Sequence, residues 1–257
     1  MRHALLATIC LFIALTTFAQ STEGVINYTE TIKIELPEDV KKRMADRGIV
    51  MDIPDSRTNK MTLHFNAESS IYQKNKTIKE EEPDMPMGRG RGVRVMRFGG
   101  NNNNQYYRDV QKKEKKQLTN MMGKDFRIED EEEKLTWKIT GKQAQLGQYQ
   151  VMEAKYENEK DTVFAWFTPQ IPVSTGPGKY SQLPGMILRV DINHGKRIIE
   201  ANDIEIRPLE EGELEVPTDG KKVSQAQFQK IREDKIQELK EMYGEERAGR
   251  FLSFEQN

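Results

Sequence analysis

Histidine most often carries proton transfer or metal ligation near neutral pH, and this sequence holds three histidines. His3 stands in the N-terminal segment, His64 on the polar side of an alternating pattern, and His194 in an Asn-His-Gly turn. Neither His64 nor His194 has a second ligand at metal spacing, and no H-E-x-x-H or G-x-S-x-G motif is present. The sequence therefore predicts no catalytic residues, no metal site and no cofactor.

Other reactive groups lie in charged or low-complexity stretches. The carboxylates of "EDEEE", residues 129–133, form one contiguous run, whereas acid–base catalysis needs two groups in different environments. The tract "GRGRGVRVMR", residues 88–97, resembles an Arg-Gly RNA-binding segment, but an acidic block precedes it and the formal net charge is only −1. Met85, Met87 and Met96 could offer thioethers to Cu(I), yet no histidine or cysteine is close in sequence. We therefore expect no nucleic-acid partner.

The N-terminus, "MRHALLATICLFIALTTFAQ", has the pattern of a secretory signal peptide. A short basic start precedes an apolar run from Ala4 to Phe18, and Thr17-Phe18-Ala19 offers a small-x-small cleavage site. The run is shorter than the roughly 20 residues that span a bilayer, which favours cleavage near Ala19/Gln20 over an anchor. Lipidation of Cys10 is a weaker alternative. We expect a periplasmic or secreted protein, close to a membrane but not spanning it.

Composition limits the kind of core that the chain can build. Its 257 residues are 36% hydrophobic and 32% charged, with a mean hydropathy of −0.78, which is more polar than an average globular chain. Cleavage after residue 20 would remove the only cysteine. The mature protein would then depend on packing for its stability, without disulfides.

Alternating apolar and polar residues predict strands along most of the chain. In residues 25–36, Ile26, Tyr28 and Ile32 share one face, and residues 60–73 read as a single alternating stretch. Between them, residues 37–48 carry the start and stop signals of a short helix. Further strands are expected at 105–110, 125–128, 135–140, 149–156, 162–167, 185–192 and 196–206, whereas the charge runs at 112–116 and 129–134 are expected in loops or hairpin ends.

These patterns predict a mainly β (α+β) fold. We expect a curved antiparallel β-sheet or half-barrel of about 8–10 strands, with a short N-terminal helix and a long C-terminal helix. Residues 1–20 would be the signal peptide, residues 21–223 the β-rich domain with a mobile loop at about 78–105, and residues 224–257 the helical segment. Ser224 is a suitable N-cap, and we expect that helix to break at Gly244.

The stretch from Phe164 to Ile192 is the most tightly specified part of the sequence. Pro169 and Pro172 cannot donate ladder hydrogen bonds, so the chain is expected to leave the sheet there. The Gly-Pro-Gly at 176–178 and the Leu-Pro-Gly at 183–185 then supply tight turns before the apolar strand that follows. Two roles stay open for this stretch: a stiff structural crossover, which we favour, or a surface that lets a ligand approach the backbone closely.

The same residues carry a family resemblance. "GPGKYSQLPGMILRVD", residues 176–191, resembles the motif of the GLPGLI family of exported Bacteroidetes proteins, and the resemblance extends upstream to about residue 135, under a quarter of the chain. Gln182 replaces the first glycine of the motif and Met186 its second leucine. Val151 and Glu153 stand where many members have Cys and Lys. The resemblance implies an envelope location and a β-rich body, and it implies no established activity.

The leading functional hypothesis is a non-enzymatic envelope protein whose curved sheet binds an apolar ligand or a partner segment. The expected binding residues are Trp137, Trp166, Gly176, Pro177, Lys179, Leu183, Pro184, Gly185 and Met186. The alternative is a scaffold or interaction protein, accessory to an outer-membrane transporter or another envelope complex, that docks through its C-terminal helix and charged loops. A hydrolase with an unrecognised site is the least supported alternative.

Overall fold

The computed structural model of the chain describes residues 22–35, 38–46, 48, 54–75 and 104–244. The expected signal peptide at 1–20 lies outside the described residues, as does the expected loop at 78–105 except for its last two residues. Gln105 already belongs to a strand.

Strands dominate the described residues. Helix α1 spans Glu38–Asp46 and helix α2 spans Gln225–Tyr243. The strands are β1 Gly24–Lys33, β2 Ser56–Phe65, β3 Ser69–Lys74, β4 Gln105–Asp109, β5 Glu114–Met121, β6 Lys124–Glu131, β7 Lys138–Leu146, β8 Tyr149–Glu157, β9 Thr162–Thr168, β10 Met186–Ile192, β11 Arg197–Glu205 and β12 Lys221–Val223.

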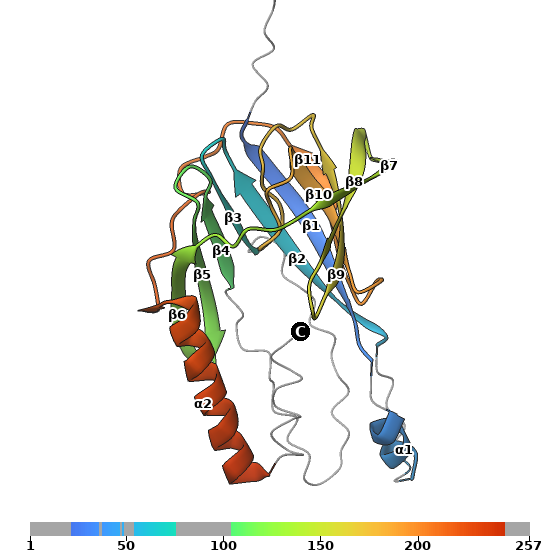
Figure 1. Cartoon of the computed structure of the whole chain (residues 1–257), viewed down its shortest axis with the longest axis vertical. Coiled ribbons are helices and arrows are strands. Elements are labelled where there is room, and N and C mark those ends of the chain that lie inside the picture. Colours follow the sequence, from blue (N-terminus) through green and yellow to red (C-terminus); the bar gives the residue numbers. More distant parts are fainter. Residues whose placement is uncertain (1–21, 36–37, 47, 49–53, 76–103, 245–257) are drawn as a thin grey trace, which may run out of the picture.

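All of these strands form one open, curved sheet (Figure 1). Their order is β12-β6-β5-β4-β3-β2-β1-β11-β10-β9-β8-β7, so β12 and β7 are the two edges. Neighbours pair antiparallel throughout, except that β12 runs parallel to β6. The mainly β prediction is confirmed, but the expected number of about 8–10 strands was too low, and the sheet is mixed.

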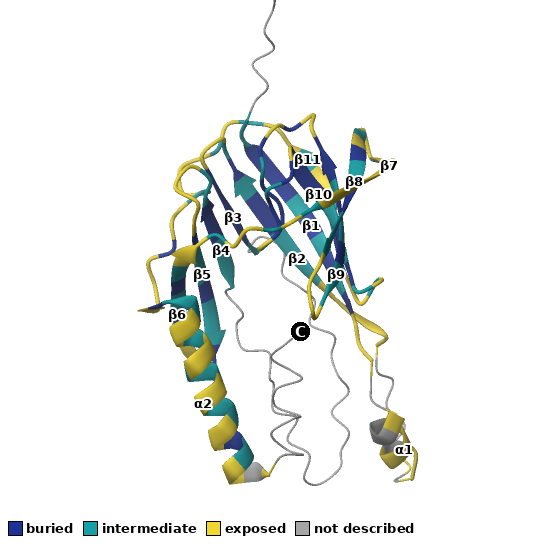
Figure 2. Cartoon of the chain, in the orientation of Figure 1, coloured by how far each residue is buried: buried dark blue, intermediate teal, exposed yellow. Residues whose placement is uncertain are grey.

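One face of the sheet carries the main core, and we call it the inner face. Directly opposed residues of neighbouring strands share a face, and Ile26 on β1 stands opposite Leu63 on β2, which stands opposite Tyr72 on β3. Ile26 and Leu63 are fully buried. Figure 2 shows the buried residues concentrated along the middle strands of the arch. The opposite side is the outer face.

Four local predictions differ from the structure. Residues 60–73 are two strands, because Asn66 accepts hydrogen bonds from the amides of Glu68 and Ser69 and closes a turn. The charge run at 112–116 enters β5 at Glu114. The strand expected from residue 135 begins only at Lys138. Glycine between two strand patterns predicts a turn at position 141, but Gly141 lies within β7 at an irregularity of its pairing with β8, with φ at +82°.

Helix α2 closes the sheet at its β6–β12 side. Ser224 is the N-cap: its hydroxyl accepts from the amide of Gln227, and the Gln227 side chain accepts in return from the Ser224 amide. Gly244 ends the helix with φ at +77°. Phe228 and Ile231 pack on a small second core formed by Met121, Phe126, Ile128 and Val223. Neither this helix nor α1 is long and apolar enough to cross a membrane.

Candidate functional site

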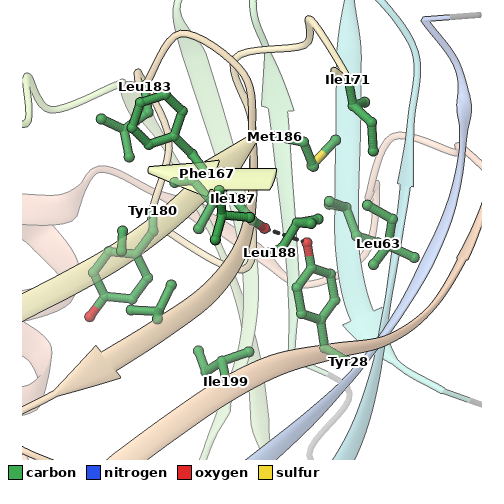
Figure 3. Packing of buried hydrophobic residues seen from close by; sticks show 14 of the residues in the cluster. Tyr28, Leu63, Phe167, Ile171, Tyr180, Leu183, Met186, Ile187, Leu188 and Ile199 are labelled. Atoms are coloured by element: carbon green, nitrogen blue, oxygen red, sulfur yellow. Dashed lines mark hydrogen bonds between the residues drawn. The ribbon is translucent and has the colours of Figure 1, made fainter. Parts of the chain in front are cut away.

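The connection between β9 and β10, residues 169–185, lies on the inner face of the sheet, and we call it the core loop. β9 ends at Thr168, immediately before Pro169. Ile171, Val173, Tyr180 and Leu183 are each no more than 5% exposed. Figure 3 shows side chains of this loop packed against Leu63 and Phe167 of the sheet. The core loop therefore fills the space over the inner face with its own side chains.

Backbone hydrogen bonds hold the core loop against the start of β10. The Met186 amide donates to the carbonyl of Ile171 over 3.0 Å, and the Ile187 amide donates to the carbonyl of Thr175, also over 3.0 Å. On the other side, the hydroxyl of Tyr28 donates to the carbonyl of Ile187 over 2.7 Å. The proline and glycine residues thus form a crossover whose backbone is hydrogen-bonded to the start of β10, in agreement with the structural role favoured for this stretch.

Polar side chains of β3 and β4 reach the buried core loop from the far half of the sheet. The hydroxyls of Ser70 and Thr175 are 2.8 Å apart, and Arg108 donates from Nη1 to Thr175 Oγ1 over 2.9 Å. Arg108 also donates from Nη2 to the carbonyl of Gly178 over 3.3 Å. The Arg108 side chain is only 1% exposed, so a full positive charge lies inside the molecule.

The segment between β6 and β7 supplies the matching negative charge. Glu132 accepts from Arg108 Nε, and it also accepts from the hydroxyl of Ser181 over 2.7 Å. Trp137 donates its indole N–H to the carbonyl of Ser181 over 2.8 Å, and Gln182 donates to the carbonyl of Glu133 over 2.8 Å. The core loop is therefore held between β4 and this crossing segment by charge-assisted hydrogen bonds.

The Ser181–Glu132 pair has the spacing of a hydroxyl and a base, but its surroundings do not suit catalysis. Ser181 has no exposed surface, and Glu132 is 9% exposed and already engaged by Arg108. A nucleophile needs room for a reacting carbon next to its oxygen. The pair is therefore best explained as part of the lock that holds the core loop.

The buried phenols also lack nucleophilic character. Burial raises the pKa of Tyr28, Tyr72 and Tyr180 above the usual range of tyrosine. These side chains stay neutral near pH 7, and the rings of Tyr28 and Tyr72 meet edge to face with centroids 5.9 Å apart. All three act as packing groups, and the Tyr28 hydroxyl is also a hydrogen-bond donor.

The structure does not gather the binding residues expected from the sequence around one cavity. Gly176, Pro177, Leu183, Gly185 and Met186 are buried in or beside the core loop, where its own packing occupies them. Lys179 and Pro184 are exposed on the same loop. Trp137 is half-buried on the inner side, with its ring centroid 5.7 Å from that of Tyr156.

Trp166 lies on the other side of the sheet. Its neighbours Ala165 and Phe167 are buried on the inner face, so Trp166 points to the outer face. There its indole ring centroid lies 5.2 Å from the guanidinium carbon of Arg189, which donates to Glu200 over 2.6 Å. Contacts of this kind contribute roughly 0.5–1 kcal/mol at partly exposed sites. The two tryptophans therefore cannot line one site.

The β7 edge of the sheet offers an exposed surface that sequence reasoning did not identify. Every residue of β7 except Leu146 is exposed, and among the described strands only β8 pairs with it. A depression of about 190 Å³ lies beside it, lined by Gln143, Gln150, Val151, Met152, Pro169 and Gln170. The sequence carried no signal for this surface, because it arises only once β7 becomes the terminal strand.

Part of the chain is similar to a described family. Residues 100–189 match the family described as "Protein of unknown function (Porph_ging)". This span contains β4 to β9, the core loop and the start of β10, so it includes both Arg108 and Glu132. It also includes the β7 edge.

Solved structures show the same fold more broadly. Two structures of PNGF-II, in space groups C2 and P21, match with TM-scores of 0.53 and 0.52 at 15% and 17% sequence identity. Each match covers 81% of this chain but only 32% of the PNGF-II chain, so the chain spans about a third of their length. Identity at this level shows the fold alone. A search of curated proteins finds no match.

Outside the Porph_ging span, His64 forms a small ionisable cluster on the outer face. Its Nδ1 lies 3.7 Å from Glu213, which accepts two hydrogen bonds from Arg207. Burial lowers the pKa of His64, and Arg207 lowers it further, while Glu213 raises it. The hydrogen bonds from Arg207 hold the pKa of Glu213 at about 2, so this carboxylate stays charged throughout the range in which histidine titrates.

The lowered pKa of His64 predicts a pH dependence of stability. The unfolded chain takes up the His64 proton at a higher pH than the folded chain, so the free energy of unfolding should fall as pH drops below about 6.5. We expect urea unfolding between pH 7.5 and 5 to show this decline in the wild type. His64→Gln should flatten it, and His194→Gln, in an exposed turn, should not. Equal declines in all three proteins would contradict the assignment.

Proposed function

We propose that the chain is a non-enzymatic, exported cell-envelope protein of the GLPGLI type that binds a segment of a partner protein. The location rests on the signal-peptide pattern of residues 1–20 and on the motif at 176–191. The observation that carries the mode of action is the buried core loop, since it occupies the face on which a curved sheet would hold an apolar ligand. The exposed groups suited to binding lie at the β7 edge and in the depression beside it.

The size of the depression beside β7 supports a protein partner over a small molecule. At about 190 Å³ it is smaller than the roughly 300–1,000 Å³ of typical small-molecule sites. It has room for a single side chain of a longer ligand, and the rest of that ligand would have to bind along the surface. We propose an outer-membrane transporter or another envelope protein as the source of the partner segment, with no nucleic acid involved.

Localisation and lipid binding provide the test. The full-length chain, expressed with its own N-terminus in a bacterium with two membranes, should appear in the periplasmic or outer-envelope fraction with a mass lacking about 20 residues. The delipidated mature protein should show no saturable uptake of a fluorescent fatty acid. Retention of the uncleaved chain in the cytoplasm would refute the location, and stoichiometric fatty-acid uptake would refute the mode of action.

A further inference from the structure

The two edges of the sheet differ in how they are protected. β12 has only three residues, and α2 packs beside it on β6. β7 has nine residues and is exposed on both faces of the sheet. No strand among the described residues pairs with the edge of β7 that faces away from β8. The β7–β8 hairpin stands at the end of the arch in Figure 1. An exposed edge of this length can pair with another chain unless it carries protecting features.

Protecting features occur in only one half of β7. The first half carries Lys138, Lys142 and the irregular pairing at Gly141, and charge and bulges of this kind discourage edge pairing. The second half, Gln143–Leu146, pairs regularly with Tyr149–Met152 and contains no charge, proline or glycine. One half of the edge is thus left open to strand addition.

The backbone of Gln145 is oriented toward this open side. Its partner in β8 is Gln150, and the Gln150 amide donates to the side chain of Gln170 over 3.0 Å. That amide therefore points away from β7, which marks Gln145–Gln150 as a pair that exchanges no backbone hydrogen bonds. In such a pair, the amide and carbonyl of Gln145 face outward, and the same holds two residues earlier, at Gln143.

A strand bound at this edge would also meet the depression. Gln143, which belongs to the open half of β7, lines it together with Gln150 and Gln170. Met152 and Pro169 add apolar surface. Main-chain hydrogen bonds at an edge supply affinity, and pockets beside it select alternate side chains. Edge and depression together have the two parts of such a site.

Charge indicates the nature of the occupant. β7 contains two lysines and no acidic residue. The Lys142 side chain is 72% exposed and its ammonium lies 3.2 Å from the Glu153 carboxylate, while Lys138 is exposed. A second copy of this chain that pairs along the whole strand is a poor occupant, because antiparallel pairing of β7 with itself over its full length places Lys142 opposite Lys142; pairing through the uncharged half alone is tested below as a dimer. Like charges directly opposite each other destabilise a strand pair. An acidic segment from another protein complements the edge.

From these observations we infer that the open edge of β7 binds an extended, acid-bearing segment of a partner protein by antiparallel strand addition. An uncharged part of the segment pairs with Gln143–Leu146 and places one side chain in the depression. Its acidic residues follow, opposite Lys142 and Lys138. This inference rests on the proposed function, and it names the surface through which the partner is held.

A peptide-binding measurement tests the site. The probe is a fluorescein-labelled peptide, Val-Thr-Val-Thr-Asp-Glu-Asp-Glu, titrated with the full mature chain and followed by anisotropy. Gln145→Pro removes the outward amide without touching the β7–β8 ladder, and we expect it to weaken binding about tenfold or more. Gln145→Ala keeps that amide and should bind within about twofold of wild type. Lys138→Glu should weaken binding severalfold, and urea midpoints should confirm that all variants fold.

Four outcomes would overturn the inference. The first three are wild-type affinity in Gln145→Pro, equal affinity of the wild type for a peptide with lysines in place of the acids, and no binding of the acidic peptide to the wild type. The fourth is a wild-type dimer that Gln145→Pro dissociates, because a second copy would then be the occupant of the edge. The export and fatty-acid-uptake measurements that test the proposed function do not depend on any of these four results. A failed site and a failed proposed function are therefore distinguishable.

Discussion

Arg108→Met is expected to lower the free energy of unfolding by about 3–5 kcal/mol, the usual cost of removing one partner of a buried ion pair. The substitution leaves the Glu132 carboxylate, 9% exposed, without its guanidinium partner. It also removes the donors to Thr175 and to the carbonyl of Gly178. Urea unfolding at pH 7, followed by tryptophan fluorescence, measures the loss.

The double variant Arg108→Met, Glu132→Gln separates the charge effect from packing. It leaves no unpaired buried charge, so we expect it to recover a large part of the lost stability, because replacing a whole buried pair is often close to neutral. Lys112→Met is the matched control: its ion pair with Asp109, the last residue of β4, has the lysine 69% exposed, so the substitution should cost far less stability than Arg108→Met. A double variant less stable than Arg108→Met would contradict this account.

Strands next to the main core could be predicted from sequence with little error. The expected strands at 149–156 and 162–167 correspond to β8, which ends at Glu157, and β9, which ends at Thr168. Their patterns are clear because each places residues such as Ala154, Ala165 and Phe167 on the inner face. Burial on one face imposes the period of two that sequence reasoning detects.

Charged strands could not be predicted in the same way. β5 begins at Glu114 in a run of charges, although Lys115 is only 7% exposed. Its ammonium reaches Glu133 over 3.0 Å, so the aliphatic stem can be covered while the charge remains paired. A lysine of this kind cannot be distinguished by sequence from a solvated one, because its partner lies in another element.

For the core loop, too, local sequence signals predicted where the loop begins and ends, but long-range contacts determine where it packs. Proline and glycine predicted correctly that the chain leaves the sheet after Thr168 and returns at Met186. They could not predict that the loop folds inward, because that depends on Arg108, 67 residues before Thr175. The sequence also could not predict that β7 is an edge strand, because the order of strands is a property of the complete sheet.

Gly185→Ala is expected to be the most damaging single substitution in the motif. Gly185 has φ at +143°, and a Cβ at this position would lie 2.1 Å from the carbonyl oxygen of Thr168. Thr168 is fully buried and stands opposite Met186 in the β9–β10 pair, so neither backbone can move without disturbing the ladder. We expect a loss of more than about 4 kcal/mol or failure to fold, measured by circular dichroism and urea unfolding.

Two further glycine variants separate steric contact from backbone strain. Gly147→Ala also has positive φ, at +56°, but nothing lies within 4 Å of its added Cβ, so it should cost only about 1–2 kcal/mol. Gly176→Ala lacks the positive φ, yet its Cβ would lie 2.7 Å from that of Ile187 and should cost an intermediate amount. If Gly185→Ala were no worse than Gly147→Ala, close packing against Thr168 could not explain the glycine. The Leu-Pro-Gly step would then owe its glycine to backbone conformation alone.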